Sequence, residues 1–540
     1  MAFLRKDKKG NEYYLRICKN VRMGKKVQQE TLYSLGKVSD YSAESLQRIG
    51  SQLYVLGEGN LENLAHSLAK EVGRYNYGYP LVIKHLLRSS GIDTFLETIH
   101  SKHHLKYNLW EMVVLMLCNR WSSPLSKLGT YHTQGDFLGL EKLELQHFYR
   151  TLDKLSQYSD ALQRLIYEKN KSFESYCLDV VFYDVTTFYF DSELVVEGSL
   201  RQKGFSKDGK IGQTQIVLGL LLDKNGLPVG YGLYAGSQYE GHTLVSEIEK
   251  LKKSYPIDKV MVVADSGMLN TSNCEQIKDV LGYDFLLGGR LKSLPKAIKK
   301  QLLDKTNYQV LELDDTDEEG KKIYIQYKTL LHKEQKLLCT YSPQRAKKDK
   351  IKREERIAKA AQLLKNPSQL EKKAALYFLK KEGQNSYQLD EQKIAEQALY
   401  GGLKVITCSD PTTSEQTMLV QYKHLYKIEQ SFRTFKSFLE TRPMFHWNDE
   451  RIKGHFALCY LSFALLRNLQ YQLKKAALPY TENELRRLLN AMQVSHLKQN
   501  KEDFYVRSAM NQETESILQH LKLKKLPNMT TKDLIDKYLT

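Results

Sequence analysis

The sequence predicts a mixed α/β protein built around a five-stranded sheet, and two observations define this class. First, three β-prone segments follow one another, and the last two are joined by the hairpin-type turn 223–226. The three segments are 178–190, 213–222 and 228–235. Second, helical and strand patterns alternate directly after them. These are the helix 243–255, the strand 259–265, the helix 272–281 and the strand 283–288.

The order of these elements narrows the fold. Residues 259–265 are almost continuously apolar, which is typical of a buried parallel strand. Three hairpin-connected strands followed by alternating helix and strand is the order of an RNase H-like fold. We therefore expect an RNase H-like core with a mixed five-stranded sheet covered by helices.

The patterns outside this core divide the chain into further parts. Residues 12–36 predict two strands around a turn, and helical periodicity dominates 60–172 and the stretch from 418 onward. Residues 296–410 interrupt the core with four short strand patterns and a strongly basic helix at 345–383. The expected parts are a β-rich arm (1–55), a helical DNA-binding or assembly domain (56–172), the first part of the core (173–295), the insertion (296–410), the second part of the core (411–475) and a helical C-terminal region (476–540).

The charge of the chain points to its class of partner. Lysine and arginine number 81 against 63 aspartates and glutamates, which gives a formal net charge of +18. A surplus of this size favours a polyanion, and nucleic acid is the commonest one. Charge spread evenly over a large soluble surface is the alternative, and the basic run 345–356 fits a solvated helix face as well as a DNA-backbone contact.

Targeting and membrane signals do not stand out in the sequence. The charged start runs directly into strand-like residues, so we expect no secretory signal. The longest apolar runs, near 112–118 and 456–466, fall short of the roughly 18 residues that a membrane span needs. Seven scattered cysteines without a Cys-x-x-Cys pair indicate buried thiols in a reducing compartment. We expect a cytoplasmic protein with no membrane partner.

Two aspartates stand on predicted strands where a carboxylate needs a partner. Asp184 lies in a hydrophobic strand, on the same face as Phe182 and Thr186, and an unpaired carboxylate there is costly. Asp265 ends a buried strand before a glycine-containing loop, a common ligand position in α/β sheets. On the first and fourth strands of the expected fold, the two acids would be neighbours and could share a metal ion. Each alone fits a turn-capping or salt-bridged role equally well.

A third acid, Glu429, has informative surroundings. If 422–436 is one helix, Tyr422, Tyr426, Glu429, Arg433 and Lys436 fall within roughly 80° of one face, at about 100° per residue. One acid with two cations and two phenols suits a metal-binding carboxylate whose neighbours hold phosphate. The alternative is an exposed face with ordinary Glu–Arg pairing at i,i+4.

The segment 422–436 resembles the signature helix of DDE transposases of bacterial insertion sequences, in the IS-four group. That signature is Tyr, two residues, Arg, three residues, Glu, six residues, Lys, and Tyr422, Glu429 and Lys436 fit its spacing. Leu425 stands at the Arg position, which removes one expected phosphate contact that Lys423 or Lys427 could replace.

Other segments carry the same resemblance. Residues 183–187 and 263–267 are similar to the first and second acid motifs of this group, and 204–208 also resembles a stretch between its first two strands. Residues 426–436, continuing through 442–443 and 446–447 to 451–452, resemble the branch whose elements encode long transposases of this size. The likeness runs from about 176 to 470, with a weaker echo in the N-terminal strands.

The resemblance implies a complete reaction. Asp184, Asp265 and Glu429 would hold two Mg²⁺ ions, or Mn²⁺ in their place, for an in-line attack on a phosphodiester. Tyr422, Lys436 and Arg433 would position phosphate. The ends of the element would be cleaved and the freed 3′-OH joined to target DNA, with a hairpin step in some members. The implied partners are double-stranded DNA with terminal inverted repeats, target DNA, and a second copy of the chain in a dimer or higher assembly.

Three other interpretations are weighed against this one. The chain could be a catalytically inactive or domesticated descendant that only binds DNA. It could be a metal-dependent nuclease or phosphatase without strand transfer. It could also be an α/β protein with a merely basic surface. Intact acids in all three motifs and the basic insertion favour the transposase.

Overall fold

The computed structural model resolves into two compact units. The structure describes residues 2–24, 26–57, 70–140, 142–174, 176–195, 197–204, 212–255, 257–268, 270–316, 322–364, 375–382, 387–499 and 502–539. The first unit comprises Met1–Arg74, Val494–Arg507 and Pro527–Lys537. The second comprises Tyr75–Gln493, Ser508–Leu526 and Tyr538–Thr540. Most of the predicted segment 204–208 and the start of the predicted helical stretch at 60 lie outside the described residues.

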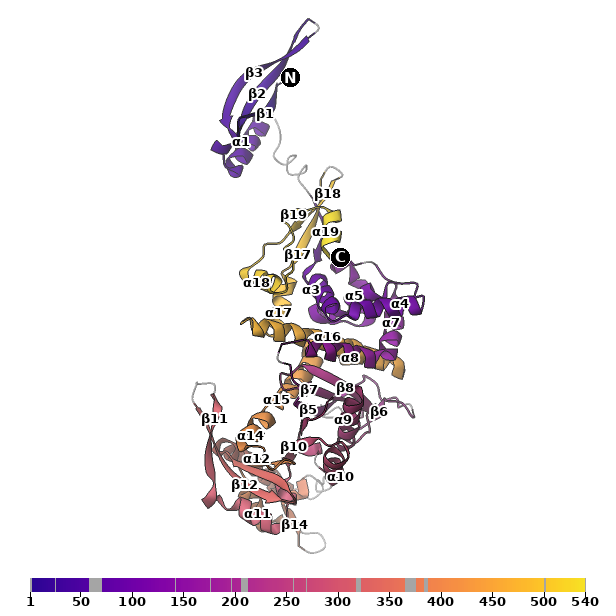
Figure 1. Ribbon diagram of the computed structural model, residues 1–540, viewed down its shortest axis with the longest axis vertical. Coiled ribbons are helices and arrows are strands. Elements are labelled where there is room, and N and C mark those ends of the chain that lie inside the picture. Colours follow the sequence, from indigo (N-terminus) through magenta and orange to yellow (C-terminus); the bar gives the residue numbers. More distant parts are fainter. Residues whose placement is uncertain are drawn as a thin grey trace. The chain divides into compact units, whose positions relative to one another are not determined.

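The first unit begins with a three-stranded antiparallel sheet in the order β1-β2-β3 (Figure 1). Its strands are β1 (Ala2–Lys9), β2 (Glu12–Met23) and β3 (Lys26–Lys37), followed by helix α1 (Ala43–Leu56). The expected pair of strands is confirmed, and β1 adds a strand that the sequence pattern did not indicate. Five of its eight residues are charged, so it carries little hydrophobic alternation, as is common for an edge strand.

The first unit also contains most of a second sheet, and here the sequence prediction was wrong. Its four strands run in the order β19-β18-β17-β4, while both 56–172 and 476–540 were expected to be helical. The strands are β4 (Lys70–Asn76), β17 (Gln493–Gln499), β18 (Glu502–Arg507) and β19 (Met529–Thr530). The sheet pairs segments more than 400 residues apart in the sequence, so no local sequence pattern could predict it.

Helices dominate the first part of the second unit, as expected. They surround the long helix α16 (Asp449–Lys475), whose middle is buried almost completely. Trp121 Nε1 donates to the Ser462 carbonyl of α16 at 3.2 Å. The helices are α3 (Gly78–Ser89), α4 (Ile92–Lys102), α5 (Leu109–Ser122), α6 (Lys127–His132), α7 (Leu145–Gln157) and α8 (Ser159–Lys171), with α17 (Glu482–Asn490) and α18 (Gln512–His520) later in the chain. A capping box formed by Thr481 and Glu484 begins α17.

The second unit contains a ten-stranded sheet, and five of its strands match the expected core. These are β5 (Val180–Tyr189), β7 (Thr214–Asp223), β8 (Pro228–Ala235), β9 (Met261–Ala264) and β10 (Asp284–Gly289). They lie in the order β8-β7-β5-β9-β10. The pairs β8–β7 and β7–β5 are antiparallel, whereas β5–β9 and β9–β10 are parallel. The Asp223 carboxylate accepts the Asn225 and Leu227 amides, which closes the predicted hairpin turn.

The insertion extends this sheet. Strand β16 (Leu403–Cys408) pairs antiparallel with β10 and, on its other side, with β13 (Gln335–Tyr341). Strands β12 (Lys322–His332) and β11 (Gln309–Thr316) continue outward from β13, and β6 (Gln202–Lys203) closes the opposite edge beside β7. Helix α11 (Lys296–Leu303) covers the core of this half, which is lined by Leu302, Leu337, Cys339 and Val405.

The basic helix of the insertion is shorter than predicted. Helix α12 (Pro343–Leu364) begins with proline at its first position, where the missing amide costs nothing. The expected helix ran to 383, but within the described residues Ala375–Phe378 is a short turn of helix, followed by strand β14 (Leu379–Lys381). Strand β15 (Tyr387–Leu389) and helix α13 (Glu391–Leu399) complete the insertion.

The two faces of β5 have different neighbours. Val181, Tyr183 and Val185 belong to a core shared with helices α9 (Thr243–Ser254) and α10 (Thr271–Glu275). Phe182 and Phe188 point to the other face, because successive side chains alternate. There the ring of Phe188 packs edge-on against Phe456 of α16, with 5.2 Å between centroids. Asp184 belongs to this second face.

The closest helix packing in the second unit gives a test of the fold. A Cβ on Gly454 of α16 would collide with the backbone carbonyl of Leu152 on α7, which cannot move aside as a side chain can. We expect Gly454→Ala to lower the free energy of unfolding by about 1–3 kcal/mol or more, measured by chemical denaturation. Gly135→Ala is the matched control, because nothing lies within 4 Å of that position. Equal stability of the two variants would contradict this packing.

Candidate active site

The two strand-borne aspartates lie side by side. Strand β5 pairs parallel with β9, and the last paired residues are Tyr183 and Ala264. Asp184 and Asp265 are the next residue on each strand, so both carboxylates occur at the same level of the sheet. The half-buried Asp184 accepts a 2.8 Å hydrogen bond from the Val185 amide, whereas Asp265 is exposed at the end of β9. The expected adjacency of these two acids is confirmed.

Tyr422 is bonded to one of these acids. It lies on helix α14 (Glu415–Lys423), and its buried hydroxyl donates to Asp265 Oδ1 at 3.0 Å. Burial, together with the negative charge of Asp265, raises the pKa of Tyr422 far above its ordinary value, so the phenol remains a proton donor. A Cβ on Gly288 of β10 would strike this hydroxyl, so glycine there leaves the space that the phenol occupies.

Glu429 is exposed on helix α15 (Tyr426–Arg433). Lys404 of β16 connects it electrostatically with Asp265. The Lys404 ammonium lies 4.2 Å from the centre of the Tyr422 ring. Burial and nearby Arg345 lower the pKa of Lys404, while Asp265 and Glu429 both oppose that shift. Lys404 therefore interacts electrostatically with the carboxylates of both Asp265 and Glu429.

The structure does not draw the acids into a finished metal site. Among the described residues, no three or more side chains of His, Cys, Asp or Glu gather closely enough to hold one metal ion. What the structure does bring together is Asp184 beside Asp265 and Lys404 within electrostatic range of Asp265 and Glu429. The assignment of all three acids as metal ligands stays a prediction.

The segment 422–436 is not one continuous helix, and the assumption that it presents a single face was wrong. Helix α14 ends at Lys423 and α15 begins at Tyr426. A π-helical turn, η10 (Thr434–Phe438), then follows, and its i→i+5 hydrogen bonds span one residue more than those of an α-helix. Arg433 and Lys436, predicted to share a role, therefore have different surroundings. The Lys436 ammonium lies 5.7 Å from the Phe188 ring centre on β5.

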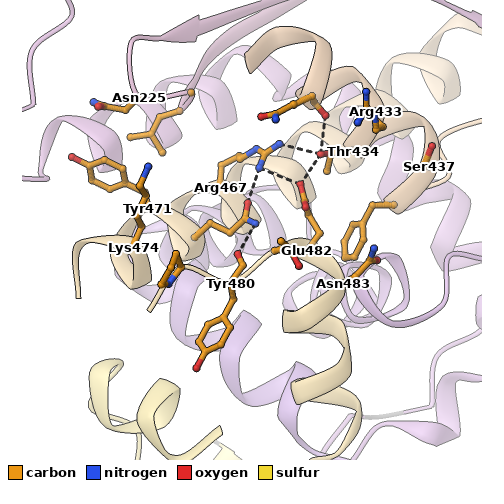
Figure 2. Close-up of a pocket in the computed structure, with 17 residues that line it drawn as sticks. Asn225, Arg433, Thr434, Ser437, Arg467, Tyr471, Lys474, Tyr480, Glu482 and Asn483 are labelled. Atoms are coloured by element: carbon orange, nitrogen blue, oxygen red, sulfur yellow. Dashed lines mark hydrogen bonds and ion pairs between the residues drawn. The ribbon is translucent and has the colours of Figure 1, made fainter. Parts of the chain in front are cut away.

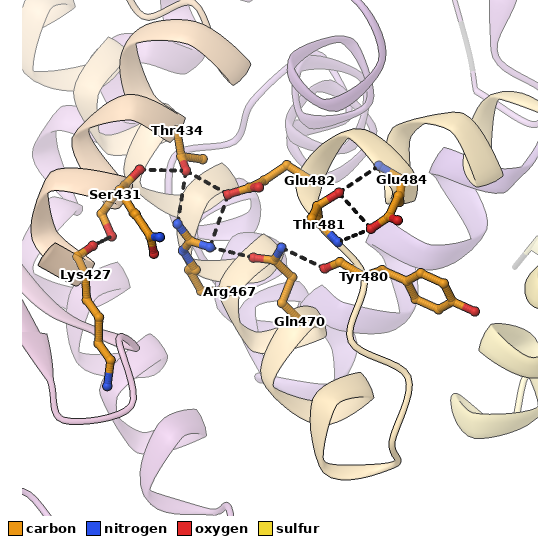
Figure 3. Close-up of polar contacts among 10 residues, drawn as sticks. Lys427, Ser431, Thr434, Arg467, Gln470, Tyr480, Thr481, Glu482 and Glu484 are labelled. Atoms are coloured by element: carbon orange, nitrogen blue, oxygen red, sulfur yellow. Dashed lines mark hydrogen bonds and ion pairs between the residues drawn. The ribbon is translucent and has the colours of Figure 1, made fainter. Parts of the chain in front are cut away.

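Arg433 lines a cavity of about 640 Å³ beside α16 and α17 (Figure 2). At its floor, polar contacts hold the π-turn in place (Figure 3). Arg467 of α16 donates to Thr434 at 3.0 Å and pairs with Glu482 at 3.2 Å. The Thr434 hydroxyl in turn lies 2.9 Å from the Glu482 carboxylate. This network fixes the helix that carries Glu429 from its far end.

A basic cleft of about 680 Å³ opens beside Asp265. Its lining includes seven cationic side chains but only two acidic ones, Asp265 and Asp349. The cations are Arg290, Lys292, Arg345, Lys352, Arg353, Arg356 and Lys404. Helix α12, the segment directly after β10 and strand β16 supply them, so the insertion places its basic helix next to the candidate acids. The sequence indicated the charge of α12, but not the contribution of Arg290, Lys292 and Lys404, which become neighbours only through the sheet order.

Two predictions from the sequence concern the cysteines and membrane-spanning segments. All seven cysteines are free thiols, and six are buried, as expected. Within the described ranges, none of the helices combines the length and apolar character needed to cross a membrane.

Comparisons with known proteins found a family match in the N-terminal residues and a similar solved structure. Residues 4–74 match the N-terminal domain of IS1634 family transposases. The structure is similar to that of a piggyBac transposase in a synaptic complex with hairpin DNA, at 9% identity and a TM-score of 0.36 over 70% of this chain and 69% of that one. No curated protein matches the sequence. The N-terminal match supports a transposase of a bacterial insertion sequence.

The network behind α15 yields a prediction about stability. Arg467→Met would leave Thr434 and the Glu482 carboxylate without their cationic partner, in a half-buried setting. We expect a loss of about 1–3 kcal/mol in the free energy of unfolding, measured by urea denaturation. Arg487→Met removes an exposed pair with Glu513 and should cost less than about 1 kcal/mol. Similar losses in both variants would show that the network does not anchor the π-turn.

Proposed function

We propose that this protein is a DNA transposase that cleaves the ends of an insertion sequence and joins the freed 3′-OH to target DNA. The observation that carries the proposal is the pair of carboxylates on adjacent parallel strands, Asp184 and Asp265, at the margin of a strongly basic cleft. The N-terminal match to IS1634 family transposases supports the same function.

The proposal includes an RNase H-like catalytic core. The strand order β8-β7-β5-β9-β10 supports it, because the first three strands form antiparallel hairpins and the last two join in parallel. In this arrangement the first and fourth strands in chain order are neighbours. The third acid comes from a helix on the same face of β5 as Asp184, since α15 and η10 pack there through Lys436 and Phe188.

The residues of the site fit divalent magnesium. Carboxylate oxygens are the ligands that Mg²⁺ prefers, and Asp184, Asp265 and Glu429 would supply them. Bound Mg²⁺, with Mn²⁺ as a substitute, would provide Lewis-acid activation of water and of the scissile phosphodiester. The exposed positions of Asp265 and Glu429 leave their carboxylates room to approach such ions.

The remaining residues would orient the acids and the phosphate. The Tyr422 hydroxyl holds one oxygen of Asp265, which leaves the other for an incoming group. Lys404 and Arg345 provide positive charge near Asp265 and would attract the phosphate backbone toward it. The Lys436 ammonium lies over the ring of Phe188, four residues after Asp184 on β5, and would hold a neighbouring phosphate of the strand being cut. We also propose Arg433 as a phosphate contact, on the side of α15 that faces the second cavity.

The proposed partners follow from this charge. Double-stranded DNA that carries the terminal inverted repeats would occupy the basic cleft, and target DNA would enter after cleavage. A homodimer or higher assembly would bring two ends together, and the protein would act in the bacterial cytoplasm on the nucleoid.

The three acids give the direct test. We expect Asp184→Asn, Asp265→Asn and Glu429→Gln each to reduce Mg²⁺-dependent cleavage of end-sequence DNA by more than about 1000-fold, because each loses a metal ligand worth several kcal/mol. Binding of the same DNA should stay within about threefold, measured by fluorescence anisotropy. Asp279→Asn, an exposed acid in the same unit, is the control and should cleave normally.

The outcomes of this test separate the candidate functions. Retained cleavage by one variant would remove that residue from the mechanism. Nicking without joined products would indicate a nuclease, and DNA binding without any cleavage by the unaltered chain would indicate a DNA-binding descendant.

The basic cleft gives a second test. The double variant Lys352→Gln with Arg356→Gln removes two of its cations. We expect weaker binding for all DNA sequences and a slope of log affinity against log salt that falls by about 2. Lys171→Gln with Lys253→Gln, on exposed positions outside the cleft, should leave the slope nearly unchanged. Equal slopes for the two double variants would exclude the cleft as the DNA-binding surface.

A further inference from the structure

A second basic cavity, of about 480 Å³, lies in the second unit away from Asp265 and Glu429. It is lined by residues of α5, α6, α7, the segment 440–446 and α16. Five of the described side chains that line it are basic, and Glu440 is the only acidic one among them. The basic residues are Arg120, Lys127, Arg442, His446 and His455.

Two cations of this cavity, Lys127 and Arg120, have no acidic partner among the described residues. Lys127 is only 5% exposed, and among the described residues its ammonium has neither a hydrogen bond nor an ion pair. Arg120 is also buried, and its guanidinium donates only to the backbone carbonyls of Leu439, Glu440 and Leu125. A buried ammonium without a partner is costly, so the cavity favours an anion.

Two further polar atoms that line the cavity have no hydrogen-bond partner in the described part of the chain. These are the Thr441 hydroxyl and His455 Nδ1, both of them buried. His455 Nε2 lies 3.2 Å from the Thr441 carbonyl, which fixes the ring beside the hydroxyl. Buried polar groups are nearly always satisfied in folded proteins, so water or a ligand in the cavity would bond these two groups. An oxyanion would accept bonds from the lysine and from the hydroxyl.

Flat aromatic surface lies on and next to the cavity lining, where Phe445 lines the cavity and Trp447 follows it by two residues. Along 444–447 the side chains alternate, with Met444 buried and His446 half-buried, while Phe445 and Trp447 are 63% and 60% exposed. The Arg201 guanidinium lies 4.3 Å from the centre of the Trp447 ring. Exposed aromatic rings beside cations are the usual platform for unstacked nucleotide bases.

The cavity is connected to the end of β5. Phe190 forms a bridge with Met444, and Arg442 lies 5.4 Å from the ring centre of Tyr189. Phe190 follows Asp184 by six residues, which is on the order of 20 Å along an extended strand. A DNA strand that reaches Asp184 could therefore also reach this cavity.

We propose that this cavity binds the phosphate of an unpaired nucleotide in the DNA substrate, with Lys127 and Thr441 holding the phosphate and Phe445 with Trp447 stacking the base. This inference rests on the proposed DNA transposase function. The site holds a strand that has left the duplex and differs from the basic cleft beside Asp265, which follows double-stranded DNA.

The protonation of Lys127 supports an anion here. Burial, with a smaller effect of Arg120, lowers the pKa of Lys127 to about 7. The groups that face it are Arg120, His446, His455 and Cys459, and the two histidines have pKa values lowered by burial and by the nearby cations. A bound phosphate would raise the pKa of Lys127 again, so binding at pH 8 would take up a proton.

The first arm of the test uses inorganic phosphate and the full chain. We expect phosphate to raise the melting temperature relative to chloride at equal ionic strength, and calorimetry at pH 8 in two buffers to show proton uptake. Lys127→Met and Thr441→Val should weaken phosphate binding about tenfold or more. Lys84→Met removes a buried lysine that pairs with Glu111 at 3.1 Å, so it should keep the phosphate response.

The second arm uses a fluorescent single-stranded oligonucleotide and the matching duplex. We expect Lys127→Met and Phe445→Leu each to weaken single-strand binding about tenfold, with a much smaller effect on the duplex. A Lys127-dependent response to phosphate without any effect on oligonucleotide binding would overturn the DNA assignment in favour of a free phosphate compound. No Lys127-dependent response in either arm would overturn the site itself.

The result is separable from the proposed function. Asp184→Asn should bind phosphate and the single strand as the unaltered chain does. If the unaltered chain fails to cleave end-sequence DNA but shows the Lys127-dependent single-strand binding, the transposase proposal fails and the nucleotide site stands. Cleavage with unchanged strand binding in Lys127→Met gives the opposite conclusion.

Discussion

The parallel pairing of β5 with β9 is the constraint on which the candidate active site depends. It sets Asp184 and Asp265 at one level, because the register ends one residue before both. Neither acid could be moved to a neighbouring position without turning its side chain to the other face of the sheet. The segment α15–η10 and helix α16 pack on the face of β5 that carries Asp184, and the basic cleft opens beside Asp265.

The fold surrounds this pair of carboxylates with a hydrogen-bond donor and a cation. Tyr422 donates to Asp265 from a buried position, and Gly288 leaves the space for its hydroxyl. Lys404 approaches from the neighbouring strand of the insertion and is influenced by Asp265 and Glu429 together. Because β16 pairs with β10, the insertion is an extension of the sheet and delivers its cations where the negative charges are.

Local patterns predicted much of this from the sequence. The core strands, the hairpin turn at Asp223 and the cap at Thr481 have signals within a few residues, and the adjacency of Asp184 and Asp265 followed from element order. The largely polar β17 and the charged β1 gave no such signal, because pairing with neighbouring strands, and not a hydrophobic pattern of their own, holds them in their sheets.

The candidate site was predictable in its residues but less so in its geometry. An ideal helix places Arg433 and Lys436 on one face, whereas the π-turn after Arg433 separates them, and the network of Thr434, Arg467 and Glu482 keeps that turn in place. Two of these three residues come from elements later in the chain, so helical periodicity alone could not reveal the turn. The same reason hides the cavity around Lys127, whose walls come from helices far apart in sequence. Residue type and spacing thus identify the chemical groups, while packing between distant segments decides which of them meet.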